Sequence, residues 1–176
     1  MHPIKHSVGY KMIKEHYGNK VAQRSQVPLI NHIDEGLAIL NELNCDWEVM
    51  EAYAVHPIFQ NDEDLLNNRW ESHYLTGEVM ILTMEYRRVA NSFLSNKIIK
   101  TEGKWSTFST TCELGLSPLP QVNEMLIADK VQNRKDFLLY HKDTHERSLE
   151  LDFYFKYWLD KLGISEERYQ ELVKDL

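Results

Sequence analysis

Hydrophobic side chains recur along this chain at the spacing of an α-helix. Between residues 28 and 44, Ile30, Ile33, Leu37 and Leu40 follow one another at intervals of three or four, which places them on one helix face. Period-two alternation of polar and apolar residues is nearly absent, and the 176 residues include only 7 Gly and 5 Pro. The sequence therefore predicts an all-α fold.

Apolar stripes and stop signals divide the chain into expected helices. They cover residues 10–17, 28–44, 46–57, 75–94, 122–140 and 148–162, with a last short helix near the C-terminus. Gly18 and Gly163 are typical stop signals, and Pro57 is expected to end or kink the third helix. Segment 101–120 is rich in Ser and Thr and is expected to be a loop. No repeat or linker divides the chain, so we expect one domain over residues 1–176.

The charge of the chain limits its partners. A formal net charge of -7 would repel the phosphate backbone of a long nucleic acid. Small basic clusters, such as Lys97, Lys100 and Lys104, are most simply solvated helix faces, although two or three cations suffice to hold a small anion. The sequence argues against a long nucleic acid and permits a nucleotide.

The cysteines and the hydropathy indicate a compartment. Cys45 and Cys112 lie far apart without a CxxC spacing, so we expect both to be reduced thiols in a cytoplasmic protein. No apolar run approaches the roughly 20 residues that span a bilayer. We expect no membrane partner.

Two of the eight histidines lie beside apolar helix positions. His32 stands between Ile30 and Ile33, and His56 follows the apolar run 52–55. Antiparallel neighbouring helices would bring these imidazoles together, and neutral imidazoles are good ligands for borderline divalent metals. A lone histidine on a helix is more often simply hydrogen-bonded or exposed, so the pair needs a further ligand to indicate a site.

Asp129 supplies a candidate for that ligand. It follows the apolar run 125–128, and a carboxylate in such surroundings costs several kcal/mol unless it is paired or binds a metal. Ion pairing with Lys130 or Arg134 is the simpler alternative. Asn133, four residues on, shares the helix face of Asp129.

The order of His32, His56 and the segment 127–134 resembles the HD superfamily of metal-dependent phosphohydrolases, and within it the (p)ppGpp hydrolase domain of the RelA/SpoT type. The resemblance extends thinly over residues 10–164 and implies a helical HD-like bundle. It also implies one divalent metal, with Mn²⁺ expected, at His32, His56 and Asp129.

The resemblance further implies a bound nucleotide as the partner. Arg24, Lys130 and Arg134 would neutralise its phosphate oxygens, and Asn133 would touch its base or sugar.

The chain departs from the HD pattern beside His56. Where the family has Asp directly after the second His, this chain has Pro57, which has no side-chain oxygen. Gln60 and Asn61 stand at the positions of the catalytic Glu and Asp, and an amide cannot act as a general base near neutral pH. Asp62 and its acidic neighbours are near enough in sequence to substitute, although acids also favour the first turn of a helix.

Two functions follow from these observations. The first is a phosphohydrolase that acts on a nucleotide or a (p)ppGpp-like alarmone, and the alternative is a non-catalytic HD-like domain that binds a nucleotide or a protein. His141 and His145 lie four residues apart as a zinc pair would, but Lys142 occupies the position of a protease glutamate. A surface pair with Asp143 and Glu146 is the simpler interpretation, and a supporting role near the same cleft is the second. The aromatic residues of 153–158 indicate a helix packed on the core, with a homo-oligomer interface as the second interpretation.

Overall fold

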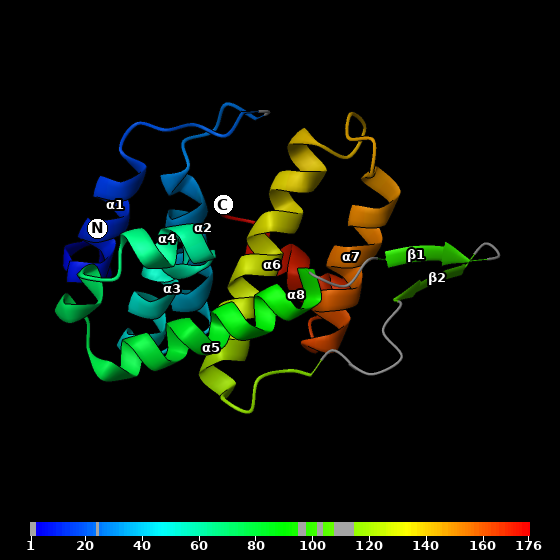
Figure 1. Ribbon diagram of the computed structural model, residues 1–176. Coiled ribbons are helices and arrows are strands. Elements are labelled where there is room, and N and C mark those ends of the chain that lie inside the picture. The colour runs from blue at the N-terminus through cyan, green and yellow to red at the C-terminus, as the bar shows by residue number, and fades with distance from the viewer. Residues whose placement is uncertain (1–2, 24, 95–97, 102–103, 108–114) are drawn as a thin grey trace.

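The computed structural model describes residues 3–23, 25–94, 98–101, 104–107 and 115–176 (Figure 1). These residues form α-helices, two short 3-10 helices and one hairpin, and the predicted all-α class is confirmed. The elements are η1 (Pro3–His6), α1 (Val8–Tyr17), α2 (Ile30–Glu42), α3 (Trp47–Phe59), α4 (Asp62–Asn67), η2 (Glu71–Tyr74), α5 (Gly77–Leu94), β1 (Ile98–Thr101), β2 (Lys104–Thr107), α6 (Pro120–Tyr140), α7 (Ser148–Lys161) and α8 (Glu166–Val173).

Helix α3 forms the centre of one half of the fold. It is apolar on nearly every side, and Ala52, Tyr53, Val55 and Phe59 are fully buried. It packs against α1, α2, α5 and α6, while α6 contacts α2 on one side and α7 on the other. Figure 1 shows α6 standing between the α2–α3 pair and α7. Helix α6 thus joins the two halves of the molecule.

Gly36 allows the close approach of α2 to α3. A Cβ atom at this position would lie 2.0 Å from the Tyr53 hydroxyl oxygen and 2.2 Å from its Cζ. Tyr53 is fully buried, so its ring has no space into which to move. A residue without a side chain is therefore required where these helices cross.

The expectation that Pro57 ends the third helix was wrong, because α3 continues through it to Phe59. Proline lacks the N–H that would bond the carbonyl four residues earlier, which belongs to Tyr53. The ring of His56 supplies the missing donor, since its Nδ1 lies 2.6 Å from that carbonyl oxygen. This side-chain contact satisfies the exposed carbonyl and lets the helix run on.

The expected loop at 101–120 was also partly wrong. Strand β2 lies within it and pairs in antiparallel register with β1, from Ile98 opposite Thr107 to Thr101 opposite Lys104. The β-branched residues Ile98 and Ile99 favour a strand over a helix here. The acidic residues after Asn61 form the first turn of the short helix α4, which confirms the simpler interpretation of these acids.

Two further expectations concern thiols and membranes. Cys45 is a half-buried free thiol, as predicted, and Cys112 lies outside the described residues. None of the helices in the described part of the chain is long and apolar enough to cross a membrane. In α7, Trp158 and Phe155 are buried, as expected for a helix packed on the core.

Candidate metal centre

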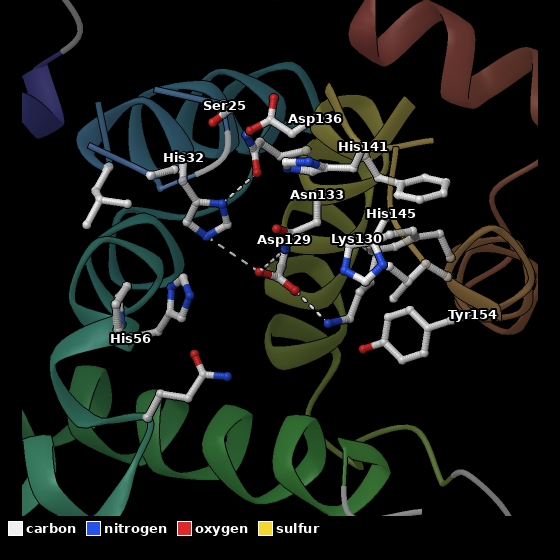
Figure 2. A pocket seen from close by; sticks show the side chains of 18 of the residues that line it. Ser25, His32, His56, Asp129, Lys130, Asn133, Asp136, His141, His145 and Tyr154 are labelled. Carbon is white, nitrogen blue, oxygen red and sulfur yellow. Dashed lines mark hydrogen bonds and ion pairs between the residues drawn. The ribbon is translucent and has the colours of Figure 1, made fainter. Parts of the chain in front are cut away.

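His32, His56 and Asp129 meet at the junction of α2, α3 and α6 (Figure 2). One ligand atom from each residue lies within 4.8 Å of the others. The Nε2 atom of His32 is 3.5 Å from Oδ1 of Asp129, and the two imidazole rings lie edge to face with centroids 5.5 Å apart. The fold therefore brings together the three predicted metal ligands from helices that are distant in sequence.

The contact with the Tyr53 carbonyl fixes the orientation of His56. A carbonyl oxygen only accepts hydrogen bonds, so Nδ1 of His56 must carry the proton in the 2.6 Å contact. The second nitrogen, Nε2, is then left with its lone pair, which is the form that binds a metal. Pro57 thus contributes to the site by leaving the Tyr53 carbonyl without its usual backbone donor.

The side chain of Gln132 orients the ring of His32, as the backbone carbonyl of Tyr53 orients the ring of His56. Its side-chain nitrogen donates to Glu35 at 3.0 Å and to Asp136 at 2.9 Å, so its Oε1 is the acceptor for Nδ1 of His32 at 2.6 Å. Lys135 contacts both carboxylates and offsets part of their charge. Outer partners of this kind hold a metal-binding imidazole in its tautomer and orientation.

Asp129 is buried and accepts two hydrogen bonds. Lys130 donates to its Oδ2 at 2.6 Å and Asn133 to its Oδ1 at 2.9 Å. Burial alone raises the pKa of this carboxyl, but the charges of Lys130, His32 and His56 outweigh that effect and bring the pKa to about 2. Asp129 is therefore a carboxylate at neutral pH.

The charge states of the neighbouring groups are consistent with a metal site. Burial opposes the charge of Lys130, but the carboxylate of Asp129 outweighs it and holds the pKa of Lys130 above its usual range. Burial and, second, the charge of His32 lower the pKa of His56 to about 4. His56 is therefore a neutral imidazole at physiological pH.

Two imidazole nitrogens and one carboxylate form a donor set suited to a divalent ion of the zinc or manganese type. Ligand atoms bound at roughly 2.1 Å to one ion lie at most roughly 4.2 Å apart. Side-chain shifts of under about 1 Å would close the present group around an ion. His32, His56 and Asp129 could therefore hold a metal, with further positions left open to water or substrate.

The three residues lie at one end of a cavity of about 620 Å³. Three predicted residues, Gln60, Lys130 and Asn133, also line it, as does Pro57. Its volume lies within the range of cavities that bind small molecules. The site thus combines a metal-binding corner with space for an organic ligand.

Other predicted residues lie elsewhere. Asn61 caps α4 by accepting from the backbone N–H of Asp64, and Asp62 is exposed and pairs with Arg87. Neither residue lines the cavity. A short segment after Gln60 turns away from α3, which places these side chains outside.

Arg134 points to the opposite side of α6. It is buried, pairs with Glu166 at 2.8 Å, and its guanidinium carbon lies 4.0 Å from the ring centroid of Tyr169. These contacts hold α8 against α6, and Arg134 does not line the cavity. Arg24 lies outside the described residues.

The structure places His141 and His145 at the cleft, as the second interpretation of the sequence has it, and not as an exposed surface pair. Both are half-buried and line the same cavity as the metal corner. They follow the end of α6, where a turn closes with a 2.8 Å backbone hydrogen bond from His145 to His141. The spacing of four was visible in the sequence, but only the packing of α7 on α6 shows which way the turn faces.

Gln132 and Asp136 were missed, although a signal for them exists. With Asp129 and Asn133 they occupy positions i, i+3, i+4 and i+7 of α6, which is one polar stripe on a largely buried helix. Such a stripe needs partners inside the fold, and it finds them in His32 and Glu35. Tyr53 gave no comparable signal, because its contribution is a backbone carbonyl.

Comparison of the chain with protein families, curated proteins and solved structures found no match.

Proposed function

We propose that this protein has an HD-like fold and is a metal-dependent phosphohydrolase that acts on a nucleotide. The observation that carries the proposal is the meeting of two imidazoles and a carboxylate, each imidazole with Nδ1 bonded and Nε2 available, at one end of a cavity. Mn²⁺ is the expected ion, and the free thiol of Cys45 fits a reducing compartment such as the cytoplasm.

In this proposal, different residues would bind the metal, the phosphate and the sugar. His32, His56 and Asp129 would hold the ion, which supplies Lewis-acid chemistry by activating water and polarising a phosphoryl oxygen. Lys130 stands beside Asp129 and would neutralise charge on a phosphate. Asn133 donates to Asp129, which leaves its own side-chain oxygen to accept from a sugar hydroxyl or another donor.

A specific observation favours the alternative, a non-catalytic HD-like domain that binds a nucleotide. Around His56 the lining residues are Pro57 and Gln60, neither of which can accept a proton from water. The carboxylates that line the described cavity, Asp129 and Asp136, are both already bonded to cationic or amide groups. Metal and nucleotide binding without turnover would follow from this arrangement.

Metal binding is tested first, by calorimetric titration of the metal-free protein with Mn²⁺. We expect one site, and we expect Asp129→Asn to abolish it because the amide is neutral. Asp160→Asn, on the exposed face of α7, is the matched control and should bind as the unchanged protein does. Absence of a metal site in the unchanged protein would contradict the hydrolase proposal.

Hydrolysis is tested next by incubating the Mn²⁺-loaded protein with nucleotides and measuring released phosphate. Turnover that disappears in Asp129→Asn supports the hydrolase. A nucleotide that raises the melting temperature and stays intact supports the non-catalytic alternative.

A further inference from the structure

The cavity has a second end with a different chemical character from the metal corner. Its walls come from the end of α6 and the start of α7, and they are largely apolar, with Phe137, Leu151 and Phe155 among them. His141 and His145 contribute two imidazole rings to this end (Figure 2). In the view they lie on the α6–α7 side, across from His32 and His56.

His145 presents a defined hydrogen-bonding group. The backbone N–H of Arg147 donates to its Nδ1 at 3.0 Å, so the proton of the neutral ring is on Nε2. Nε2 is therefore a donor and pairs with an acceptor on a ligand. The bond also holds the ring in place, because Arg147 leads directly into α7.

His141 adds a second polar group at the same end. Its Nδ1 is buried and has no hydrogen-bond partner within the described part of the chain. A buried polar atom without a partner costs free energy, and a ligand that fills the cavity can remove that cost. The turn between the two histidines is closed by the backbone bond from His145 to His141, so their positions are fixed relative to one another.

The charges around this end disfavour a second phosphate. Asp136 lines the cavity near His141, and in the turn Lys142 and Arg147 only balance the acids Asp143 and Glu146. An apolar wall with a few neutral donors and acceptors is instead typical of a site for a planar heterocycle, in which polar groups fix the orientation.

We propose that His141 and His145 form the nucleobase subsite of the cavity and determine base specificity, so that the nucleotide lies with its phosphate at His32, His56 and Asp129 and its base against α7. This inference rests on the proposed function, because the metal corner defines which end takes the phosphate. It assigns a role to two residues that take no part in holding the metal.

The test compares ribose 5-phosphate with the four nucleoside 5'-monophosphates by calorimetry on the Mn²⁺-loaded protein. We expect at least one nucleotide to bind about tenfold or more tightly than ribose 5-phosphate. In His141→Ala and His145→Ala that advantage should fall to about threefold or less, while the affinity for ribose 5-phosphate stays the same. His73→Ala, an exposed histidine in η2, is the control and should retain the full advantage.

A conservative variant distinguishes a lost contact with the base from a misfolded protein. His145→Asn keeps an oxygen that can accept from the Arg147 N–H and loses the donor at Nε2, and it should lose the base advantage while binding Mn²⁺ normally. If the variants weaken ribose 5-phosphate as much as the nucleotides, the histidines hold the phosphate and the inference is wrong. It is equally wrong if no base adds affinity.

Failure of the proposed function gives a different result. If Mn²⁺ does not bind the unchanged protein, the metal site is refuted, and the same series without metal still tests whether the base advantage depends on the two histidines. If Mn²⁺ binds and the variants leave the base advantage intact, only the nucleobase subsite is refuted.

Discussion

At the scale of single residues, one hydrogen bond both satisfies the backbone carbonyl of Tyr53 and orients the ring of His56. The carbonyl lacks a backbone donor because residue 57 is proline, and the ring supplies one from Nδ1. The same bond leaves Nε2 of His56 facing its partners in the metal corner. Pro57, which has no side-chain oxygen, thus orients a neighbouring imidazole that could bind a metal.

Replacing Pro57 by Ala tests this dependence. The new backbone N–H would compete with His56 for the Tyr53 carbonyl, so we expect the affinity for Mn²⁺ to fall about threefold to tenfold even though a proline is removed from a helix. Calorimetric titration measures the change. Pro118→Ala, at an exposed position, is the control. Equal or tighter binding in Pro57→Ala would show that the bond does not position His56.

The buried neutral state of His56 predicts a pH dependence of stability. Its pKa falls from 6.5 to about 4 on folding, so the unfolded chain binds the proton first as the pH drops. The contribution of neutral His56 to the free energy of unfolding should therefore be complete above about pH 6.5. The free energy of unfolding should fall by about 3 kcal/mol between pH 6.5 and 4. Urea unfolding at several pH values measures it. His56→Asn should show a shallower decline, and an unchanged slope would contradict the assignment.

At the scale of the elements, the crossing of α2 and α3 depends on Gly36. Gly36→Ala would drive a methyl group into the ring of Tyr53, which contacts both metal-site imidazoles. We expect a loss of about 1–3 kcal/mol of stability and weaker Mn²⁺ binding. Gly77→Ala is the matched control, because a Cβ there meets nothing within 4 Å, and it should change stability by under about 1 kcal/mol. Equal melting temperatures for the two variants would contradict this account.

The attachment of α8 to α6 depends on Arg134. Arg134→Met should lower the free energy of unfolding by about 1–3 kcal/mol, because it removes the ion pair with Glu166 and the contact with Tyr169. The Mn²⁺ affinity should remain within twofold of the original, contrary to a role in phosphate binding. Arg168→Met removes only exposed ion pairs and should leave the free energy of unfolding nearly unchanged. Chemical unfolding and calorimetry distinguish the two variants.

Elements with a continuous apolar stripe could be predicted from the sequence, and short elements could not. Helices α2, α5, α6 and α7 each repeat their core positions over several turns, whereas α4 has six residues and no buried side chain. At the site, the order of His32, His56 and Asp129 was informative. The roles of Tyr53 and Arg134 could not be predicted from the sequence. The role of Tyr53 depends on its backbone carbonyl, and that of Arg134 depends on the side of α6 against which α8 packs.

At the scale of the whole molecule, the metal corner joins three helices that contribute one ligand each. An ion that binds only the folded chain stabilises it by about 2.7 kcal/mol at 100 times its dissociation constant. For a domain of this size we expect Mn²⁺ to raise the melting temperature by about 5–10 °C. Thermal unfolding with Mn²⁺ and with EDTA measures the shift. A similar shift in Asp129→Asn would place the ion elsewhere.

Helix α6 carries a residue at each end of the cavity, and its length sets a minimum size for any ligand that touches both. From Asp129 to His141, the residue after the end of α6, the chain rises by about 18 Å at 1.5 Å per residue, and the two side chains reach into the same cavity, which brings their polar atoms closer together. Orthophosphate or pyrophosphate would occupy one end without reaching the other. If the cavity takes a nucleotide, as proposed, molecular length as well as charge would select the ligand.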